Sequence, residues 1–492
     1  MKNTVTTTRF FQLFCMLLLC VLNMGARAQT PNPSFVAIGH IESFSLITPS
    51  NPLTSATMTV RGQTITIPSS LLVVMPGQYL TAHDIFRWNL SANAYAATPL
   101  AQSGLALRDV PAPAVPFEAD IIGNIVNGVY IAGVVRISQG ALHVTAGFIQ
   151  SMNPATGDMT VGPLGGSAGV RVHLNDPKGI YGPPSTTLDA RFSLDPDNSP
   201  VHAKTGFPVC TPRTDDPAKC PAANRPADPA LRFRFTCGPG IPASVDAPTV
   251  ASCNPSLPMP LAVGDYITVV GMLARDSAGQ FFVSAHGLGA ELGVYTAQGV
   301  DPAYVFIEDA LQGTKGESFA GIPQEETTRF RIVGFTTDPS RNVEVSMVDS
   351  GLDEVGTSLS GPGGLFPSNL AQLGRFRNTW PSKDNARAVR RDVRAKIVGL
   401  SPAKLPNGLT PGLYTAPIGE YIFPENTRFG VGSFPIPVSF ENFCFLRTPG
   451  AAVTTVDARV LTALDPFPAS GHPVSQTAGS AGARVCATID LP

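Results

Sequence analysis

Apolar and polar residues alternate with a period of two through many short segments of this chain. In the segment 57–67, Met58 and Val60 alternate with threonines, and two isoleucines do the same after Arg61 and Gly62. This period is typical of a strand with one buried face, and the polar pair between the two arms predicts a hairpin. Similar pairs of arms occupy 147–162, 266–285 and 330–349.

Long helical periodicity is absent, and the best helix candidates, 82–88 and 368–374, extend for two turns at most. Strands that recur about every ten residues without intervening helices indicate sandwiches or small barrels. In the predicted hairpins 266–285 and 330–349 the first strand contains a glycine, Gly271 or Gly334, at a place where the strand of a small barrel has to bend. The sequence therefore predicts an all-β fold of several small OB-like barrel or sandwich modules in tandem.

Turn-rich stretches and composition divide the chain. The segments 293–299 (GVYTAQG) and 412–419 (GLYTAPIG) each follow a Val-Gly strand, which suggests related repeat modules. The expected divisions are a signal peptide at 1–28, an N-terminal β module and linker at 29–116, a second β module at 117–190, a Pro/Cys-rich segment at 191–260, a third β module at 261–325 and C-terminal β modules at 326–492.

Six cysteines follow residue 28, and four of them lie in the segment 191–260, which contains 14 prolines. So many prolines exclude regular sheet, and an even number of cysteines in an exported chain favours disulfides. We therefore expect an ordered loop segment that is held by its disulfides. Because sequence neighbours close the shortest loops, the expected pairs are Cys210–Cys220, Cys237–Cys253 and Cys444–Cys486.

The first 28 residues have the composition of a secretory signal peptide. Lys2 and Arg9 precede the apolar run 10–24, and Ala26-Arg27-Ala28 is a small-x-small cleavage pattern. The run is short for a membrane span, and no second run of spanning length follows. We expect a secreted or periplasmic protein with no membrane anchor.

Charge and composition argue against some classes of binding partner. The 492 residues carry a net charge of −2, and 14% of them are charged, against a usual figure of about 25%. Proteins that bind nucleic acid usually show a strong basic excess, so we expect no nucleic-acid partner. We also expect no cofactor.

Four segments, 57–81, 202–213, 261–271 and 293–305, resemble those of a group of exported, functionally uncharacterised β-rich proteins of fungi and some bacteria. The resemblance covers most of residues 35–430. It implies an exported β-rich fold and no particular activity.

Two patterns that usually carry chemistry give no catalytic or metal-binding residue here. The letters of 165–169 match the G-x-S-x-G of a hydrolase elbow, but the alternating residues after Ser167 predict a strand where an elbow needs a helix. Ser167 is therefore interpreted as a turn residue. The seven histidines lack metal-ligand spacing, and no C-x-x-C occurs. We expect His143, His173 and His286 on strands, at the solvent face or a sheet edge.

The most unusual charge feature is the segment 375–396, which holds eight lysines and arginines against two aspartates. On a strand from Val389 to Ile397, alternate positions share one solvent face. Such a face, with an aromatic ring nearby, fits an anionic polymer or a sugar. The alternative is a charged edge strand that prevents aggregation. The candidate binding residues are Arg375, Arg377, Trp380, Arg390, Arg394 and Lys396.

The sequence favours an exported, non-catalytic protein whose β modules bind a surface or matrix ligand. Anionic or neutral cell-wall polysaccharide, or another cell-surface component, is the expected partner. The alternative is a secreted hydrolase with a cleft between modules. A cluster of His, Asp or Glu at the bottom of a cleft would favour the hydrolase.

Overall fold

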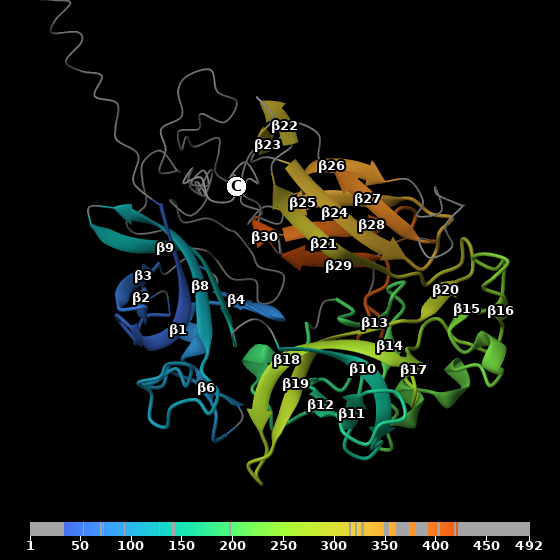
Figure 1. Cartoon of the computed structure of the whole chain (residues 1–492), viewed down its shortest axis with the longest axis horizontal. Coiled ribbons are helices and arrows are strands. Elements are labelled where there is room, and N and C mark those ends of the chain that lie inside the picture. Colours follow the sequence, from blue (N-terminus) through green and yellow to red (C-terminus); the bar gives the residue numbers. More distant parts are fainter. Residues whose placement is uncertain are drawn as a thin grey trace, which may run out of the picture.

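The computed structural model describes residues 34 to 421, whose regular elements are nearly all β-strands (Figure 1). Within that span the description leaves out residues 53, 69, 70, 72, 93, 127, 140–142, 196, 197, 314, 315, 320, 321, 326–328, 349–353, 361–372, 380–391, 401–403, 418 and 419. The predicted signal peptide, 1–28, and the predicted pair Cys444–Cys486 lie outside the described residues. The strands form three groups, which confirms the predicted all-β fold of several small modules.

Five strands with alternating buried and exposed residues form the first barrel. They are β1 (Ser34–Leu46), β2 (Ala56–Val60), β3 (Gln63–Ile67), β8 (Glu118–Val126) and β9 (Val129–Ser138). β1 pairs with β2 and β8, β2 with β3, and β8 with β9, all antiparallel, and the parallel pair β3–β9 closes the ring. This is the arrangement of an OB-like barrel. Apolar side chains of alternate residues, among them Met58, Val60, Ile65 and Ile67, fill its interior.

The second barrel repeats this topology. Its strands are β10 (His143–Met152), β11 (Met159–Gly162), β12 (Val170–Leu174), β18 (Tyr266–Arg275) and β19 (Phe281–Ala290). β10 pairs with β11 and β18, β11 with β12, and β18 with β19, while the parallel pair β12–β19 closes the ring. The predicted hairpins 57–67, 147–162 and 266–285 are thereby confirmed.

A glycine bends the fourth strand of each barrel at the same place. The register shifts between Ile122 and Gly123 in β8, and between Val270 and Gly271 in β18. A Cβ atom on Gly123 would lie 2.1 Å from the carbonyl oxygen of Ile131, and one on Gly271 would lie 2.5 Å from that of Ser284. Only glycine fits such a close approach, and the bulge lets the strand bend so that the ring closes. The predicted role of Gly271 is confirmed.

A long insertion separates the third and fourth strands of each barrel. In the first barrel the insertion holds β4 (Val73–Met75), β5 (Gln78–Leu80), α2 (Ala82–Ile85), β6 (Trp88–Asn89) and β7 (Ala94–Tyr95). In the second barrel it holds η1 (Ala190–Phe192), β13 (Val201–Ala203), β14 (Val209–Cys210), η2 (Pro217–Lys219), η3 (Ala222–Asn224), η4 (Pro229–Leu231), β15 (Arg234–Cys237), β16 (Thr249–Val250) and β17 (Met259–Pro260). β20 (Gly293–Thr296) pairs with β15 just after the barrel ends.

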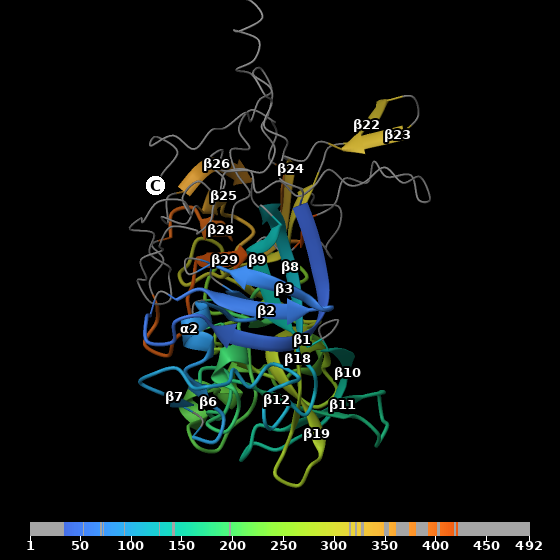
Figure 2. The ribbon, with the colours of Figure 1, turned by 90° about the vertical axis from the view of Figure 1, so that its left-hand side faces the viewer.

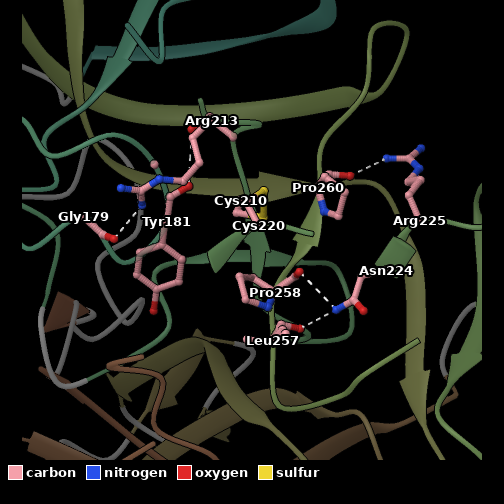
Figure 3. Close-up of a disulfide and its surroundings, with 12 residues drawn as sticks. Gly179, Tyr181, Cys210, Arg213, Cys220, Asn224, Arg225, Leu257, Pro258 and Pro260 are labelled. Atoms are coloured by element: carbon pink, nitrogen blue, oxygen red, sulfur yellow. Dashed lines mark hydrogen bonds between the residues drawn. A yellow bond between two sulfur atoms is a disulfide. The ribbon is translucent and has the colours of Figure 1, made fainter. Parts of the chain in front are cut away.

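The Pro/Cys-rich segment is ordered by disulfides and side-chain bonds to its backbone (Figure 3). Cys210–Cys220 and Cys237–Cys253 pair as predicted. Beside the first disulfide, the Asn224 amide donates to the carbonyl oxygens of Leu257 and Pro258 at 2.9 and 3.2 Å. Short strands and 3-10 turns therefore replace regular sheet, as the prolines predict.

The third module is a sandwich of two four-stranded sheets. One sheet has the order β27 (Arg375–Thr379), β24 (Arg329–Thr336), β21 (Val305–Gly313), β30 (Glu420–Tyr421), and the other β26 (Glu354–Ser360), β25 (Val343–Val348), β28 (Asp392–Ile397), β29 (Leu413–Pro417). β22 (Gly316–Phe319) and β23 (Ile322–Glu325) form a separate hairpin. One core, which includes Ile307, Ile332, Val345 and Ile397, lies between the sheets.

Two predictions about pairing are wrong here. The arms of the predicted hairpin 330–349, β24 and β25, lie in different sheets, because the segment between them bonds to another part of the chain: the Thr337 N–H donates to the Tyr304 carbonyl at 2.9 Å. The two segments that were predicted to belong to related modules, 293–299 and 412–419, also have different pairing in the structure. β20, in GVYTAQG, is parallel to β15, whereas β29, in GLYTAPIG, is antiparallel to β28.

Strand pairing also divides the chain differently from the predicted boundaries. β1 and β8 pair across the boundary after residue 116, and β12 and β19 join the predicted modules 117–190 and 261–325 in one barrel. β21 and β24 pair across the boundary after residue 325. The alternation of apolar and polar residues identifies strands but does not show which strands pair. Module boundaries that were predicted at long loops therefore fall at insertions within a barrel.

Candidate functional site

The four predicted basic residues that the structure describes lie on two different sheets of the third module. Trp380 and Arg390 lie outside the described residues. Arg375 and Arg377 lie on β27, in one sheet of the third module, and Arg394 and Lys396 lie on β28, in the other sheet. The guanidinium of Arg375 is 3.7 Å from the carboxylate of Glu308.

Arg394 and Lys396 occupy the outer face of β28, as predicted, because the alternate residues Ala395 and Ile397 are buried. β28 lies between β25 and β29 and is not an edge strand, whereas β27, which carries Arg375 and Arg377, lies at the edge of its sheet, so the alternative of a charged edge strand fits the first part of the segment. Lys396 stands opposite Glu344 of β25. Opposite charges at directly facing positions stabilise a sheet, which gives Lys396 a structural role in the described strands.

Ser167 lies in the exposed turn between β11 and β12 and leads into a strand. Gly165, in the same turn, has a φ of 69°. The Gln150 amide donates to the carbonyl oxygens of Pro163 and Ala168 and so holds the turn closed. The predicted turn at Ser167 is confirmed.

The histidines lie on the predicted strands, but one prediction about them is wrong. His143 and His173 are half-buried, whereas His286 is 9% exposed and its Nδ1 atom has no hydrogen-bond partner among the described residues. Burial lowers the pKa of His286 to about 4. His202, whose ring centroid is 4.1 Å from that of Phe306, also has its pKa lowered to about 4 by burial. Alternation alone does not show that other parts of the chain cover such a strand face, as Phe306 covers His202.

A hollow of about 470 Å³ lies on the surface of the first barrel. It forms where β1 leaves its pairing with β8 and begins its pairing with β2. Its lining residues are Ile38, Gly39, His40 and Glu42 of β1, Arg61 of the β2–β3 turn, Leu107 and Glu118.

Both acidic groups that line the hollow already have partners. His40 Nε2 lies 3.3 Å from Glu118 Oε1, and these two residues face each other across β1 and β8. Glu42 Oε1 accepts the Gly62 N–H at 2.8 Å and so fixes the β2–β3 turn against β1. Each carboxylate keeps a second oxygen that can accept a hydrogen bond.

A face of six hydroxyl side chains continues from the hollow over β1, β2 and β3, which lie side by side in Figure 2. Its members are Ser43, Ser45, Thr57, Thr59, Thr64 and Thr66. Ser43 Oγ donates to Thr59 Oγ1 at 2.9 Å, and the hydroxyls of Ser45 and Thr57 are also 2.9 Å apart. Register places Thr64 beside Thr59 and Thr66 beside Thr57, so the hydroxyl face has two rows of three. Rows and columns are about 7 and 5 Å apart.

The turn that carries Arg61 has an unusual residue. Arg61 and Gly62 have φ values of 52° and 72°, and no other non-glycine residue of the described chain has a positive φ. Two-residue hairpins of this kind prefer Asn-Gly or Asp-Gly. An arginine in the left-handed region costs about 1 kcal/mol, so the turn alone does not account for Arg61.

Sequence reasoning missed this site, although signals for it are present. The alternating threonines of TMT and TIT mark the hydroxyl face, and the Arg-Gly pair stands where a tight hairpin favours Asn-Gly. The hollow also depends on Leu107 and Glu118, which lie far along the chain. No local pattern places those two residues beside β1.

Comparison with protein-family models, curated proteins and solved structures gives no match for this chain. Over the described ranges, no group of three or more His, Cys, Asp or Glu side chains is arranged to hold a metal ion. None of the helices in the described part of the chain is long and apolar enough to cross a membrane. The assignment therefore rests on the geometry of the hollow and the hydroxyl face.

Proposed function

We propose that this chain is a non-catalytic exported protein that binds polysaccharide along β1 of the first barrel. The observation that carries the proposal is the continuity of the hollow with the hydroxyl face: Glu42 lines the hollow, and Ser43 begins the hydroxyl rows. Two disulfides agree with an oxidising compartment outside the cytoplasm. The resemblance to exported β-rich proteins stays a prediction.

The chemistry of this surface suits a sugar polymer. Hydroxyl groups and carboxylate oxygens exchange hydrogen bonds with sugar hydroxyls, and Ile38 and Leu107, which are 50% and 39% exposed, offer apolar contact to a sugar ring. An open surface also suits a chain better than a small molecule, which proteins usually enclose in a deep pocket. OB-like barrels bind oligosaccharides on the face of their second and third strands, here β2 and β3.

The test is retention of the purified mature protein on polysaccharides. We expect Thr57→Val with Thr66→Val, which removes one hydroxyl from each of two strands without changing side-chain volume, to weaken retention about tenfold. Thr268→Val on the half-exposed face of β18 is the matched control and keeps full retention. A wild-type protein that is retained on no polysaccharide would refute the proposal.

The second candidate is a glycoside hydrolase, and one observation favours it: Glu42 and Glu118 line the same hollow. Glycosidases use two carboxylates that flank the bond to be broken. The same retention experiment separates the two candidates if released reducing ends are measured. Release of sugar by the wild type, and its loss in Glu118→Gln, would replace the binding proposal by the hydrolase.

A further inference from the structure

The side chain of Arg61 is directed into the hollow by its turn. A Cβ atom on Gly39 would lie 3.1 Å from Arg61 Cγ and 3.6 Å from Arg61 Nε, so the arginine lies across the bare backbone of Gly39. The Glu42 carboxylate holds the turn through the Gly62 N–H at 2.8 Å. Gly39 and Glu42 thus position the guanidinium over β1 and limit the directions that it can take.

The guanidinium of Arg61 differs from the other polar groups of the hollow because its donors are uncommitted. Glu118 is paired with His40, and Glu42 is bonded to Gly62. Among the described residues, no hydrogen bond or ion pair to the Arg61 side chain is found. A strained residue that is kept at a cost and has an unused functional group points to a ligand.

We propose that Arg61 recognises the carboxylate of an acidic sugar, so that the hollow selects acidic polysaccharide over its neutral counterpart. This inference rests on the proposed function and names its ligand class. The planar fork of a guanidinium matches a carboxylate through two parallel N–H donors, which a lysine could not do. A sugar ring held in this way lies in the hollow beside Arg61, whose own side chain covers Gly39.

The two glutamates of the hollow limit how such a ligand is oriented. Their charges repel a carboxylate, but the hollow is open to water, where charges a few ångströms apart interact weakly. The free oxygens of Glu42 and Glu118 can accept hydrogen bonds from sugar hydroxyls, whereas the ligand carboxylate turns toward Arg61. The hollow therefore distinguishes the charged end of the ring from its hydroxyl edge.

The experiment compares three polymers at about 20 mM salt, where screening is weak. Polygalacturonate offers carboxylates, its fully methyl-esterified form offers the same backbone without charge, and a sulfated polysaccharide offers a different anion. We expect the wild type to bind polygalacturonate about tenfold more tightly than the ester form. Equal binding of the two forms would refute the inference, and preference for the sulfated polymer would refute the assignment of a carboxylate.

The decisive variant is Arg61→Asn, which supplies the residue that the turn prefers. We expect this variant to lose the preference for polygalacturonate while its melting temperature stays level or rises by about 2 °C. Arg275→Asn, an exposed arginine of the second barrel, is the matched control and keeps the preference. An unchanged preference in Arg61→Asn, or a fall in its melting temperature, would contradict the role given to Arg61.

The outcomes also separate the two proposals. Binding of both polymers without preference leaves the proposed function standing and refutes the acidic-sugar inference. Binding of no polymer refutes the proposed function itself. Arg61→Lys, which keeps the charge and removes the fork, is expected to retain part of the preference, because a lysine pairs with a carboxylate as a point charge.

Discussion

The side-chain amide of Gln139 pairs with both backbone groups of Leu273. Gln139 Nε2 donates to the Leu273 carbonyl at 3.0 Å, and Gln139 Oε1 accepts the Leu273 N–H at 2.7 Å. Gln139 directly follows the last strand of the first barrel, and Leu273 lies on β18 of the second. A buried side chain therefore takes the place of a neighbouring strand and joins the two barrels.

Removal of this amide tests the junction. We expect Gln139→Leu to lower the free energy of unfolding by about 2 kcal/mol, because the half-buried N–H and C=O of Leu273 lose their partner together. Urea unfolding of the whole protein measures the effect. Gln280→Leu, at an exposed turn, is the control. An unchanged urea midpoint in Gln139→Leu would show that the two barrels do not depend on this pair.

Arg191 forms the second junction and is fully buried. Its guanidinium bonds to Asp189 and donates to the carbonyls of Ile85 and Ser103 in the first barrel's insertion, at 3.0 and 2.7 Å. We expect Arg191→Lys to cost about 3 kcal/mol or more, because an ammonium cannot reach all these acceptors and Asp189 is left poorly paired. Thermal unfolding measures the loss. Full stability of Arg191→Lys would contradict this account.

Stability is expected to fall in mildly acidic solution because of His286. Its pKa is lowered to about 4 in the folded protein and is about 6.5 in the unfolded chain, so between these values the unfolded chain binds a proton that the folded protein excludes. This contribution is fully present above pH 6.5 and is lost as the pH falls toward 4, by about 3 kcal/mol in total.

The slope of stability against pH tests this assignment. We expect His286→Gln to reduce the slope between pH 4 and 6.5, and part of the remaining slope comes from His202, whose pKa burial also lowers to about 4. Equal slopes for His286→Gln and the wild type would show that His286 does not cause the loss of stability in acid.

Two of the three predicted disulfides are present, and the third remains to be mapped. We expect peptide mapping under non-reducing conditions to find Cys444 linked to Cys486 and no free thiol. Replacing Cys237 and Cys253 by serine opens a loop of 16 residues and is expected to cost about 3 kcal/mol. A link from Cys444 to any cysteine of the segment 191–260 would refute the third pair.

Ser167→Ala is expected to leave any hydrolytic activity of the purified protein unchanged, because Ser167 is a turn residue. The loss of a nucleophile lowers the rate by about a thousandfold or more. A drop of that size in Ser167→Ala would contradict the turn assignment.

Local patterns predict the strands and the bends well. Met58 and Val60 are buried in β2, and the bulge at Gly271 lies where the strand glycine predicts it. These features depend on residues within one hairpin, where a period of two and a missing Cβ atom act directly on the backbone. Neighbouring cysteines were predictable for the same reason, because short loops close most easily.

Pairing between distant strands, and the site that depends on it, could not be predicted in the same way. Gly334 marks a strand as Gly271 does, yet β24 pairs with β21 and β27 rather than with the next strand. His286 alternates like a surface residue but is covered. The hollow joins β1 to Glu118 across an insertion of about fifty residues, and nothing in a local window of sequence encodes that approach.

The parallel closure of each barrel has a consequence for the order in which the chain matures. Val172 of β12 can pair with Val283 of β19 only after that residue has been made, more than a hundred residues later. The core of the first barrel also includes Phe192 and Met272, which belong to the second barrel and its insertion. A chain that is synthesised from its N-terminus therefore leaves the first barrel incomplete until the strands of the second have followed. Such late, non-local contacts slow folding and leave apolar edges uncovered for longer, which favours aggregation before the second barrel closes.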